Sequence, residues 1–200
     1  MTTQTMLRTA LSVTALAALL ACGGSSSSPK VSAASDAKGI TYANPASAGW
    51  RLERDPSSTP THIVLNLIGP AGLKGRGIAL TVHSDNSKMA WGRISGAYIQ
   101  DGGAFELAMD PTDPNEARLL VGGVKGSDLM VGAFQKDPNL SAKPLDTKLY
   151  SFAIDFKADA HLATGETIPL SVTKARLLPE DLGPRKLQDV TVAAGTLKAN

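Results

Sequence analysis

The chain has 200 residues, of which 42% are hydrophobic and 4% aromatic, so a single domain with a largely aliphatic core is expected. Its formal net charge is +2 and it has no run of Lys and Arg. This excludes the basic face that nucleic-acid binding requires, and we predict no nucleic-acid partner. Glycine (19) and proline (12) are frequent, which favours short strands joined by turns over long helices.

Residues 1–21 have the organisation of a secretory signal peptide. Arg8 stands in a short polar start, and a mostly apolar run follows from Ala10 to Ala21. A helix of that length spans about 18 Å, which is too short for a hydrocarbon core of about 30 Å. A signal peptide is therefore favoured over a transmembrane anchor.

The only cysteine follows this segment directly. The sequence Leu19-Leu20-Ala21-Cys22 resembles a bacterial lipobox, with Leu20 where a small residue is more usual. The resemblance implies that Cys22 is lipidated on its thiol and becomes the first residue after cleavage, since two or three acyl chains hold a protein firmly to a membrane. Gly23 follows instead of Asp, which by similarity to enteric lipoproteins implies the outer membrane. A buried structural cysteine is the alternative.

Residues 22–48 are rich in Gly, Ser and Ala and predict a flexible tether. Such a sequence buries too little apolar surface to offset the entropy of ordering. Docking on the domain is plausible only near Ile40 and Tyr42. The folded domain is accordingly predicted over residues 49–200.

That domain has the pattern of an all-β protein. The run His62–Ile68 is continuously apolar and predicts a central strand, and Ile78–His83 alternates, with Ile78, Leu80 and Val82 on one face. Tyr150–Lys157 alternates as well, with its aromatic residues inside and Ser151, Asp155 and Lys157 outside.

Weaker patterns complete the predicted strands. Pro169 places an edge or a strand start in Ile168–Thr173, and Val190–Leu197 predicts a last strand. Alternation is weak at Phe105, Leu107 and Met109, and likewise at Met130 and Phe134, while Asn115–Leu120 could hold a helical turn. With Gly- and Pro-containing turns between them, these segments predict eight or nine strands in an antiparallel two-sheet sandwich.

Two blocks of this pattern are similar to cohesin domains. Gly77–Trp91 resembles their early strand pair, and Leu149–Ala160 followed by Gly165–Val172 resembles their late pair. His83 departs from the family, which usually has an aromatic residue there. The resemblance covers roughly residues 60–198 and implies a nine-stranded, jelly-roll-like sandwich, a fold that scaffold modules and carbohydrate-binding modules share.

Two common catalytic signatures are absent from the sequence. His62, His83 and His161 lack a metal-ligand spacing, and no G-x-S-x-G motif is present. With Cys22 lipidated, no thiol nucleophile remains. We therefore predict no cofactor and no enzyme, although a pocket that joined His83, Asp85 and Asp101 would revive an enzymatic interpretation.

Two further sets of residues are candidates for binding. In the loop around Asp110, oxygen ligands suit Ca²⁺, but the prolines there serve turns equally well without metal. Exposed aromatic rings could stack on sugars, although packing in the core is the more common use. The candidate sets are Asp110, Asp113, Asn115 and Glu116 for calcium, and Trp50, Trp91 and Tyr98 for a sugar.

The sequence thus predicts a non-enzymatic, lipid-anchored lipoprotein of the cell envelope, most simply at the outer membrane. Its β-sandwich would bind another envelope component, a protein or a glycan, as a scaffold or accessory module. The alternatives are a carbohydrate-binding module and, less favoured, an enzyme on the same scaffold.

Overall fold

The computed structural model describes residues 36–110, 112–113, 115–181 and 187–200. The predicted signal peptide, Cys22 and most of the tether lie outside the described residues. Within them the fold is all-β, as predicted, with fourteen strands and a single short 3-10 helix at Ala158–Ala160. None of the helical structure in these segments is long and apolar enough to cross a membrane.

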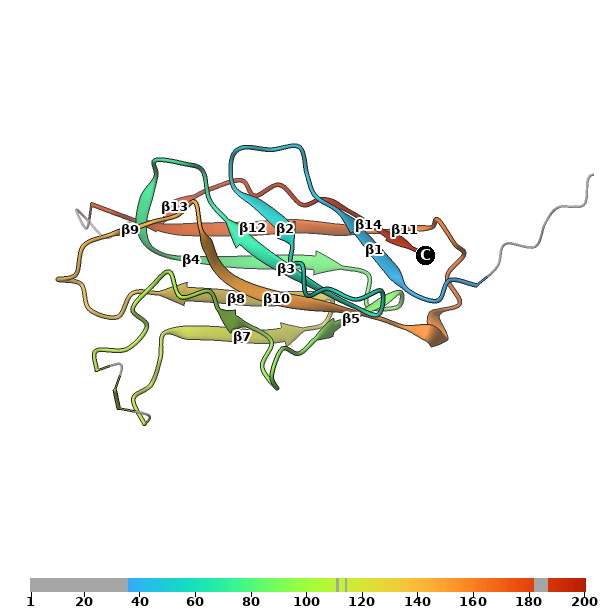
Figure 1. The fold of residues 1–200 in the computed structure, drawn as a ribbon, viewed down its shortest axis with the longest axis horizontal. Helices are drawn as coiled ribbons and strands as arrows, with labels where there is room; N and C mark the ends of the chain where they lie inside the picture. Colours follow the sequence, from blue (N-terminus) through green and yellow to red (C-terminus); the bar gives the residue numbers. More distant parts are fainter. Residues whose placement is uncertain (1–35, 111, 114, 182–186) are drawn as a thin grey trace, which may run out of the picture. The chain divides into compact units, whose positions relative to one another are not determined.

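The larger sheet has six antiparallel strands (Figure 1). Its continuous path places β4 in the middle and β7 at one edge, and β9 pairs with one end of β4. The strands in spatial order are β13 (Gln188–Asp189), β12 (Leu170–Pro179), β4 (Lys74–Ser84), β8 (Asp128–Phe134) and β7 (Leu120–Lys125), with β9 (Lys143–Pro144) beside β4.

A five-stranded sheet and a three-stranded sheet complete the fold. The first contains β2 (Arg51–Arg54), β3 (His62–Ile68), β10 (Lys148–Phe156), β5 (Met89–Gly92) and β6 (Gln100–Asp101). The second contains β1 (Ile40–Ala43), β14 (Thr196–Ala199) and β11 (Thr167–Ile168), which lie together at the right-hand end of Figure 1. The central position predicted for His62–Ile68 is confirmed, because β3 lies between β2 and β10.

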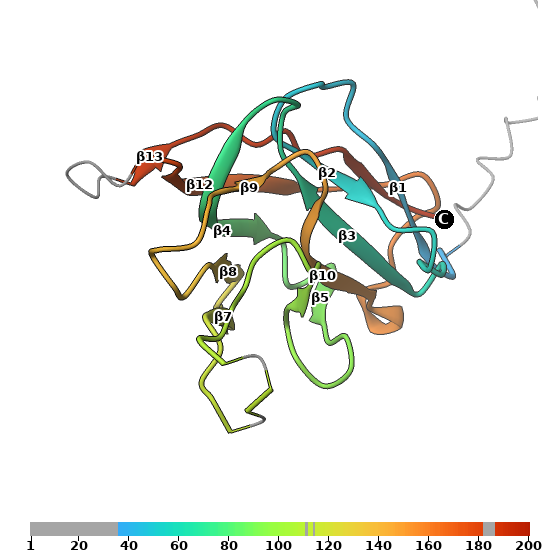
Figure 2. The ribbon, with the colours of Figure 1, turned by 60° about the vertical axis from the view of Figure 1, so that its left-hand side comes forward.

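One apolar core joins the large sheet to the five-stranded sheet (Figure 2). The alternation predicted for β4 is confirmed, since Ile78, Leu80 and Val82 are 0%, 3% and 0% exposed. Strands β3 and β10 contribute Leu65 and Phe152 to the same cluster. Burial of such aliphatic and aromatic side chains contributes roughly 25 cal/mol per Å² and is the main term that holds the two layers together.

The prediction for the outer face of β10 is wrong at Ser151, which is 1% exposed. Its hydroxyl donates to Asn66 Oδ1 at 2.7 Å, and Asn66 Nδ2 donates to Asp55 Oδ2 at 2.8 Å. A buried hydroxyl needs such a partner. Hydrogen bonds from Ser57 hold the pKa of Asp55 below its ordinary value, so the network ends on a carboxylate.

Three weaker predictions also differ from the structure. Phe105 and Leu107 are buried within a loop and form no strand, and the Leu107 carbonyl accepts a hydrogen bond from Leu119 N at 2.9 Å. The predicted last strand over Val190–Leu197 is replaced by two short strands, β13 and β14. The possible helical turn at Asn115–Leu120 is absent from its described residues, which lead from turn and bend into β7.

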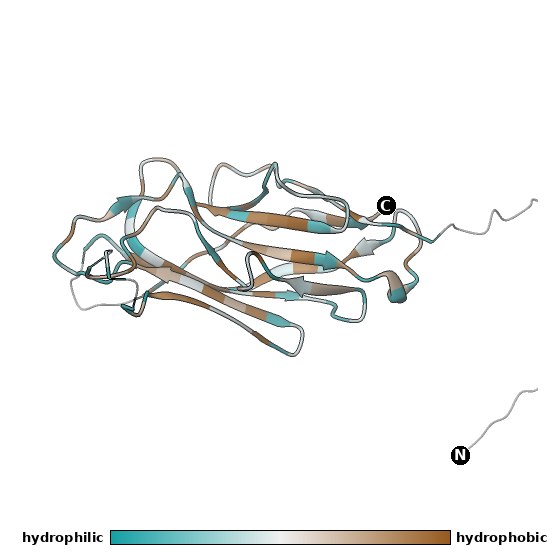
Figure 3. Cartoon of the chain, turned by 60° about the horizontal axis from the view of Figure 1, so that its bottom comes forward, coloured by the Kyte–Doolittle hydropathy of each residue, from teal (hydrophilic) through white to brown (hydrophobic). Residues whose placement is uncertain are grey.

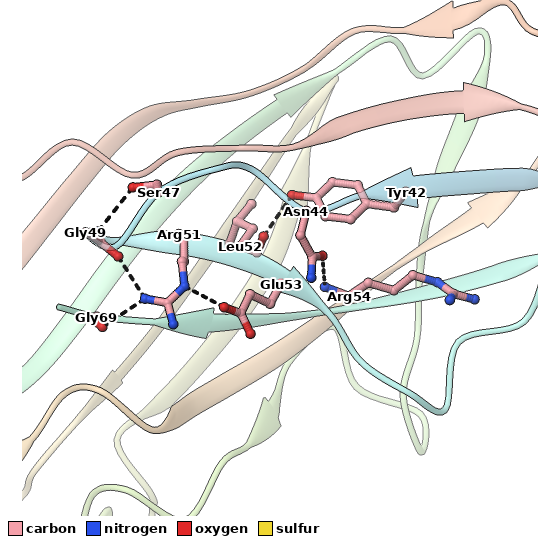
Figure 4. A network of polar contacts seen from close by, with 9 residues as sticks. All are labelled: Tyr42, Asn44, Ser47, Gly49, Arg51, Leu52, Glu53, Arg54 and Gly69. Carbon is pink, nitrogen blue, oxygen red and sulfur yellow. Dashed lines mark hydrogen bonds and ion pairs between the residues drawn. The ribbon is translucent and has the colours of Figure 1, made fainter. Parts of the chain in front are cut away.

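The fold begins before residue 49. Strand β1 pairs antiparallel with β14, and Ile40 is fully buried. The Tyr42 hydroxyl donates to Leu52 O at 3.0 Å (Figure 4). It also accepts from Gly195 N at 2.6 Å. The last part of the predicted tether therefore belongs to the sandwich, at the two positions where docking was plausible.

Candidate functional site

The outer face of the large sheet carries an apolar strip. Along β8, Leu129, Val131 and Ala133 turn into the core, so Met130, Gly132 and Phe134 turn outward. Register places Met130 beside Thr81 of β4 and Gly132 beside Ala79. Figure 3 shows that several strands are apolar over much of their length.

Neighbouring β7 extends this strip with Val121, which pairs with Gly132. Val121 is 61% exposed and Met130 43% exposed, which is high for apolar side chains in the middle of regular strands. Between them lies a shallow hollow of about 330 Å³, bordered by Ala79 and Phe134. We call these four residues, Ala79, Val121, Met130 and Phe134, the outer strip.

The outer strip lies flat because two of the positions next to Phe134, in β4 and β8, are glycines. A Cβ on Gly77 would lie 2.7 Å from Ala133 O and inside contact distance of the Phe134 ring. A Cβ on Gly132 would lie 3.1 Å from the same ring. The two glycines therefore let Phe134 lie close against the sheet.

Charged side chains border the outer strip on one side. Lys174 and Arg176 of β12 project outward, and their register places them beside Thr81 and Ala79. Arg176 also contacts Asp189 at 3.2 Å. An apolar centre with a cationic border is an arrangement suited to protein association, in which a polar rim surrounds a desolvated centre.

The predicted sugar-binding aromatics do not share one exposed face. Trp50 and Trp91 are 7% and 9% exposed, and the Trp91 indole donates to Ser127 O at 3.2 Å. Tyr98 is half-buried and has the Arg93 guanidinium 4.1 Å from its ring centre. Trp91 and Tyr98 border one hollow of about 340 Å³, which Trp50 does not line.

The predicted calcium loop is organised by its own hydrogen bonds. Asp110 accepts from Thr112 and Asp113 accepts from Asn115 N at 2.8 Å. Glu116 accepts from the backbone N–H of Met109 and of Asp110, and it pairs with Lys136. These contacts, Lys136 first, lower the pKa of Glu116 to about 2.

No group of His, Cys, Asp and Glu side chains in the described segments has the geometry to hold a metal ion. Each histidine instead contacts one aspartate. The Nδ1–Oδ1 distance is 2.5 Å for His62 and Asp155 and 2.7 Å for His83 and Asp128, and His161 lies 3.6 Å from an Asp36 oxygen.

The residues named for a possible catalytic pocket have separate partners. His83 bonds to Asp128, while Asp85 accepts hydrogen bonds from Ser87, which hold the pKa of Asp85 below its ordinary value. Asp101 lies in β6 of the other sheet and pairs with Arg118.

The residues of the outer strip were not among the predicted site residues. Their sequence signal is weak, because Val121 and Met130 both stand in continuous apolar runs, which are typical of buried strands. Exposure of one face of a sheet depends on what covers it, which local sequence does not record. The predicted lipidation site, Cys22, lies outside the described residues.

No protein-family model matches the chain, and no curated protein matches it. Several solved cohesin modules are similar to it in structure. The sixth cohesin of scaffoldin B from Acetivibrio cellulolyticus, solved with a dockerin, is 14% identical with a TM-score of 0.48, covering 74% of this chain and 96% of that one.

Two others have comparable values. A type I cohesin from a cohesin–dockerin complex of Clostridium thermocellum is 11% identical with a TM-score of 0.46, covering 76% of this chain and 92% of that one. The seventh ScaB type I cohesin from Pseudobacteroides cellulosolvens is 10% identical with a TM-score of 0.42, covering 73% and 93%. Similarity of this degree assigns no partner to this chain.

Proposed function

We propose that this chain is a non-enzymatic binding module of the bacterial cell envelope, held to a membrane by lipid on Cys22. Its sandwich would dock another protein on the outer strip. The observation that carries the proposal is the exposure of Val121 and Met130, at 61% and 43%, side by side on regular strands. Adjacent exposed apolar side chains on a sheet form a surface at which another protein can be bound.

The composition of the strip favours a protein over a glycan as the partner. Sugar rings are bound by exposed aromatic faces, whereas the most exposed members here are Val121 and Met130. Methionine is enriched in protein interfaces and adapts its shape to a partner. Lys174 and Arg176 at the border favour a partner with acidic groups beside its apolar centre.

The docking proposal is tested by photo-crosslinking in the native host. A photoreactive residue at Met130 should give a defined covalent adduct with one protein, and Val121→Asp should remove that adduct. The same photoreactive residue at Met109, which is 57% exposed on the Asp110 loop, is the matched control and should give none. Equal adducts from both positions, or an adduct insensitive to Val121→Asp, would contradict docking on the outer strip.

Anchoring rests on the lipobox resemblance and is tested separately. A Cys22→Ala variant should remain uncleaved and lose labelling by radioactive palmitate. It should also no longer be recovered with the lipoproteins of the membrane fraction. Cys22→Ser serves as a second variant, because it keeps the size of the side chain but cannot form a thioether. Normal processing of either variant would rule out lipidation at this position and leave the docking proposal untouched.

A further inference from the structure

Strand β7 forms an open edge of the large sheet. In the described part of the chain it pairs with β8 alone, and it is the outermost strand of that sheet in Figure 1. Its residues from Val121 to Lys125 are exposed except for Gly123, which is half-buried. A strand edge with this exposure offers backbone groups to a further strand.

The direction of the backbone groups follows from one hydrogen bond. Phe134 N donates to Leu119 O at 2.9 Å, so Leu119 points its carbonyl toward β8. Because residues alternate along an antiparallel pair, Val121 and Gly123 also face β8. The N–H and C=O groups of Leu120, Gly122 and Val124 therefore point away from the sheet, and none of them is bonded outward within the described segments.

This edge lacks the usual protection. Leu120 to Val124 contains no charged residue and no proline, and the register with β8 is continuous without a bulge. The edge strand β2 is different, since three of its four residues are charged and Leu52 N donates to Ala193 O at 3.0 Å. Proteins normally block open edges with charges, prolines or bulges.

We propose that β7 pairs antiparallel with β7 of a second copy, about a two-fold axis at Gly122. In this register Gly122 meets its own equivalent, and Leu120 lies opposite Val124 of the second copy. All outward-facing residues then meet in pairs that exchange both N–H···O bonds. A register shifted by one residue would place outward groups opposite inward ones and form no ladder.

The side chains fit the same register. At the axis Gly122 has no side chain of its own, and Ile99 packs against one face of it, where an added Cβ would lie 2.8 Å from Ile99 Cγ2. Val121 lies opposite Gly123 of the second copy, and a Cβ at Gly123 would meet nothing within 4 Å, so space for Val121 exists. Lys125 lies opposite Leu119, and no like charges oppose each other. Such self-complementarity is what a two-fold interface between identical chains requires and a chance partner does not supply.

The dimer is tested by sedimentation equilibrium of the full chain in density-matched detergent. The apparent mass of the wild type should rise with protein concentration toward the mass of two chains. Val124→Pro removes an outward N–H that β8 does not use, and proline is tolerated at such edge positions. Because both copies lose a donor, the dissociation constant should rise at least about tenfold. Val124→Thr keeps the donor and the branched shape, and its dimer should persist.

A second variant and a second measurement cover a folding defect of the proline variant. Val124→Lys keeps the backbone donor but places a charge against Leu120 of the second copy, and it should also weaken the dimer. Amide exchange in the wild type should slow with concentration at Leu120, Gly122 and Val124 but not at Gly123. A monomer at all concentrations, or a dimer indifferent to both variants, would overturn the proposal. Neither result depends on docking of another protein at Met130.

Discussion

Replacing a buried tyrosine by phenylalanine is expected to have opposite effects on the free energy of unfolding at two positions, Tyr150 and Tyr42. Tyr150 is 0% exposed, and its hydroxyl has no hydrogen-bond partner among the described residues. Burial raises its pKa well above the ordinary value. Tyr42 is 7% exposed, and its hydroxyl is satisfied by Leu52 O and Gly195 N. Burial also raises the pKa of Tyr42, to about 12.

The magnitudes follow from these contacts. A buried polar group without a partner costs roughly 1–3 kcal/mol, so Tyr150→Phe should raise the free energy of unfolding by about 1 kcal/mol after the small loss of packing. Tyr42→Phe loses two hydrogen bonds of about 1 kcal/mol each and leaves a backbone N–H and C=O unpaired. It should lower the free energy of unfolding by about 2–3 kcal/mol.

Urea denaturation of the two variants and the wild type, followed by the fluorescence of buried Trp50 and Trp91, measures both effects. The slope of free energy against urea should be unchanged, because neither variant alters the surface exposed on unfolding. A loss of more than about 1 kcal/mol in Tyr150→Phe would refute the reasoning, since it would mean that the hydroxyl is stabilising where it lies.

Two further outcomes are expected. Gly77→Ala should lower the free energy of unfolding by about 1–3 kcal/mol in a thermal melt, because its Cβ would collide with the Phe134 ring, whereas Gly123→Ala at an open position should change it little. Glu116 has its pKa lowered from 4.5 to about 2, so its contribution to loop stability is complete above about pH 4.5 and lost as the pH falls toward 2. An NMR titration of the Glu116 carboxyl carbon with a midpoint near 4.5 would contradict the contacts with Lys136.

The strands that were predicted well contain their signal locally. Ile78, Leu80 and Val82 repeat every second residue, and the pleat turns that period directly into one buried face. The prediction that Ser151 is exposed is wrong because alternation distinguishes the two faces of a strand but not whether the second face is covered. Here the cover comes from Asn66 and Asp55 of distant segments.

The start of the fold and the outer strip are difficult to predict because both depend on segments that are distant in the sequence. Only Ile40 and Tyr42 mark β1 within a Gly/Ser-rich segment, and their partner strand is more than 150 residues away. Val121 and Met130 have the sequence pattern of buried strand residues. Their exposure follows from the number of layers on that side of the sheet, which is a tertiary property.

The pairing of β1 with β14 has a consequence for how the chain acquires its structure. The first described strand has no ladder partner until residues 196–199 have been synthesised, so an N-terminal fragment leaves Ile40 and Tyr42 unsupported. Contacts of such long sequence separation are slow to form, because the closure entropy is spent before they are made. In a nascent chain β1 therefore stays without its ladder partner until residues 196–199 have left the ribosome.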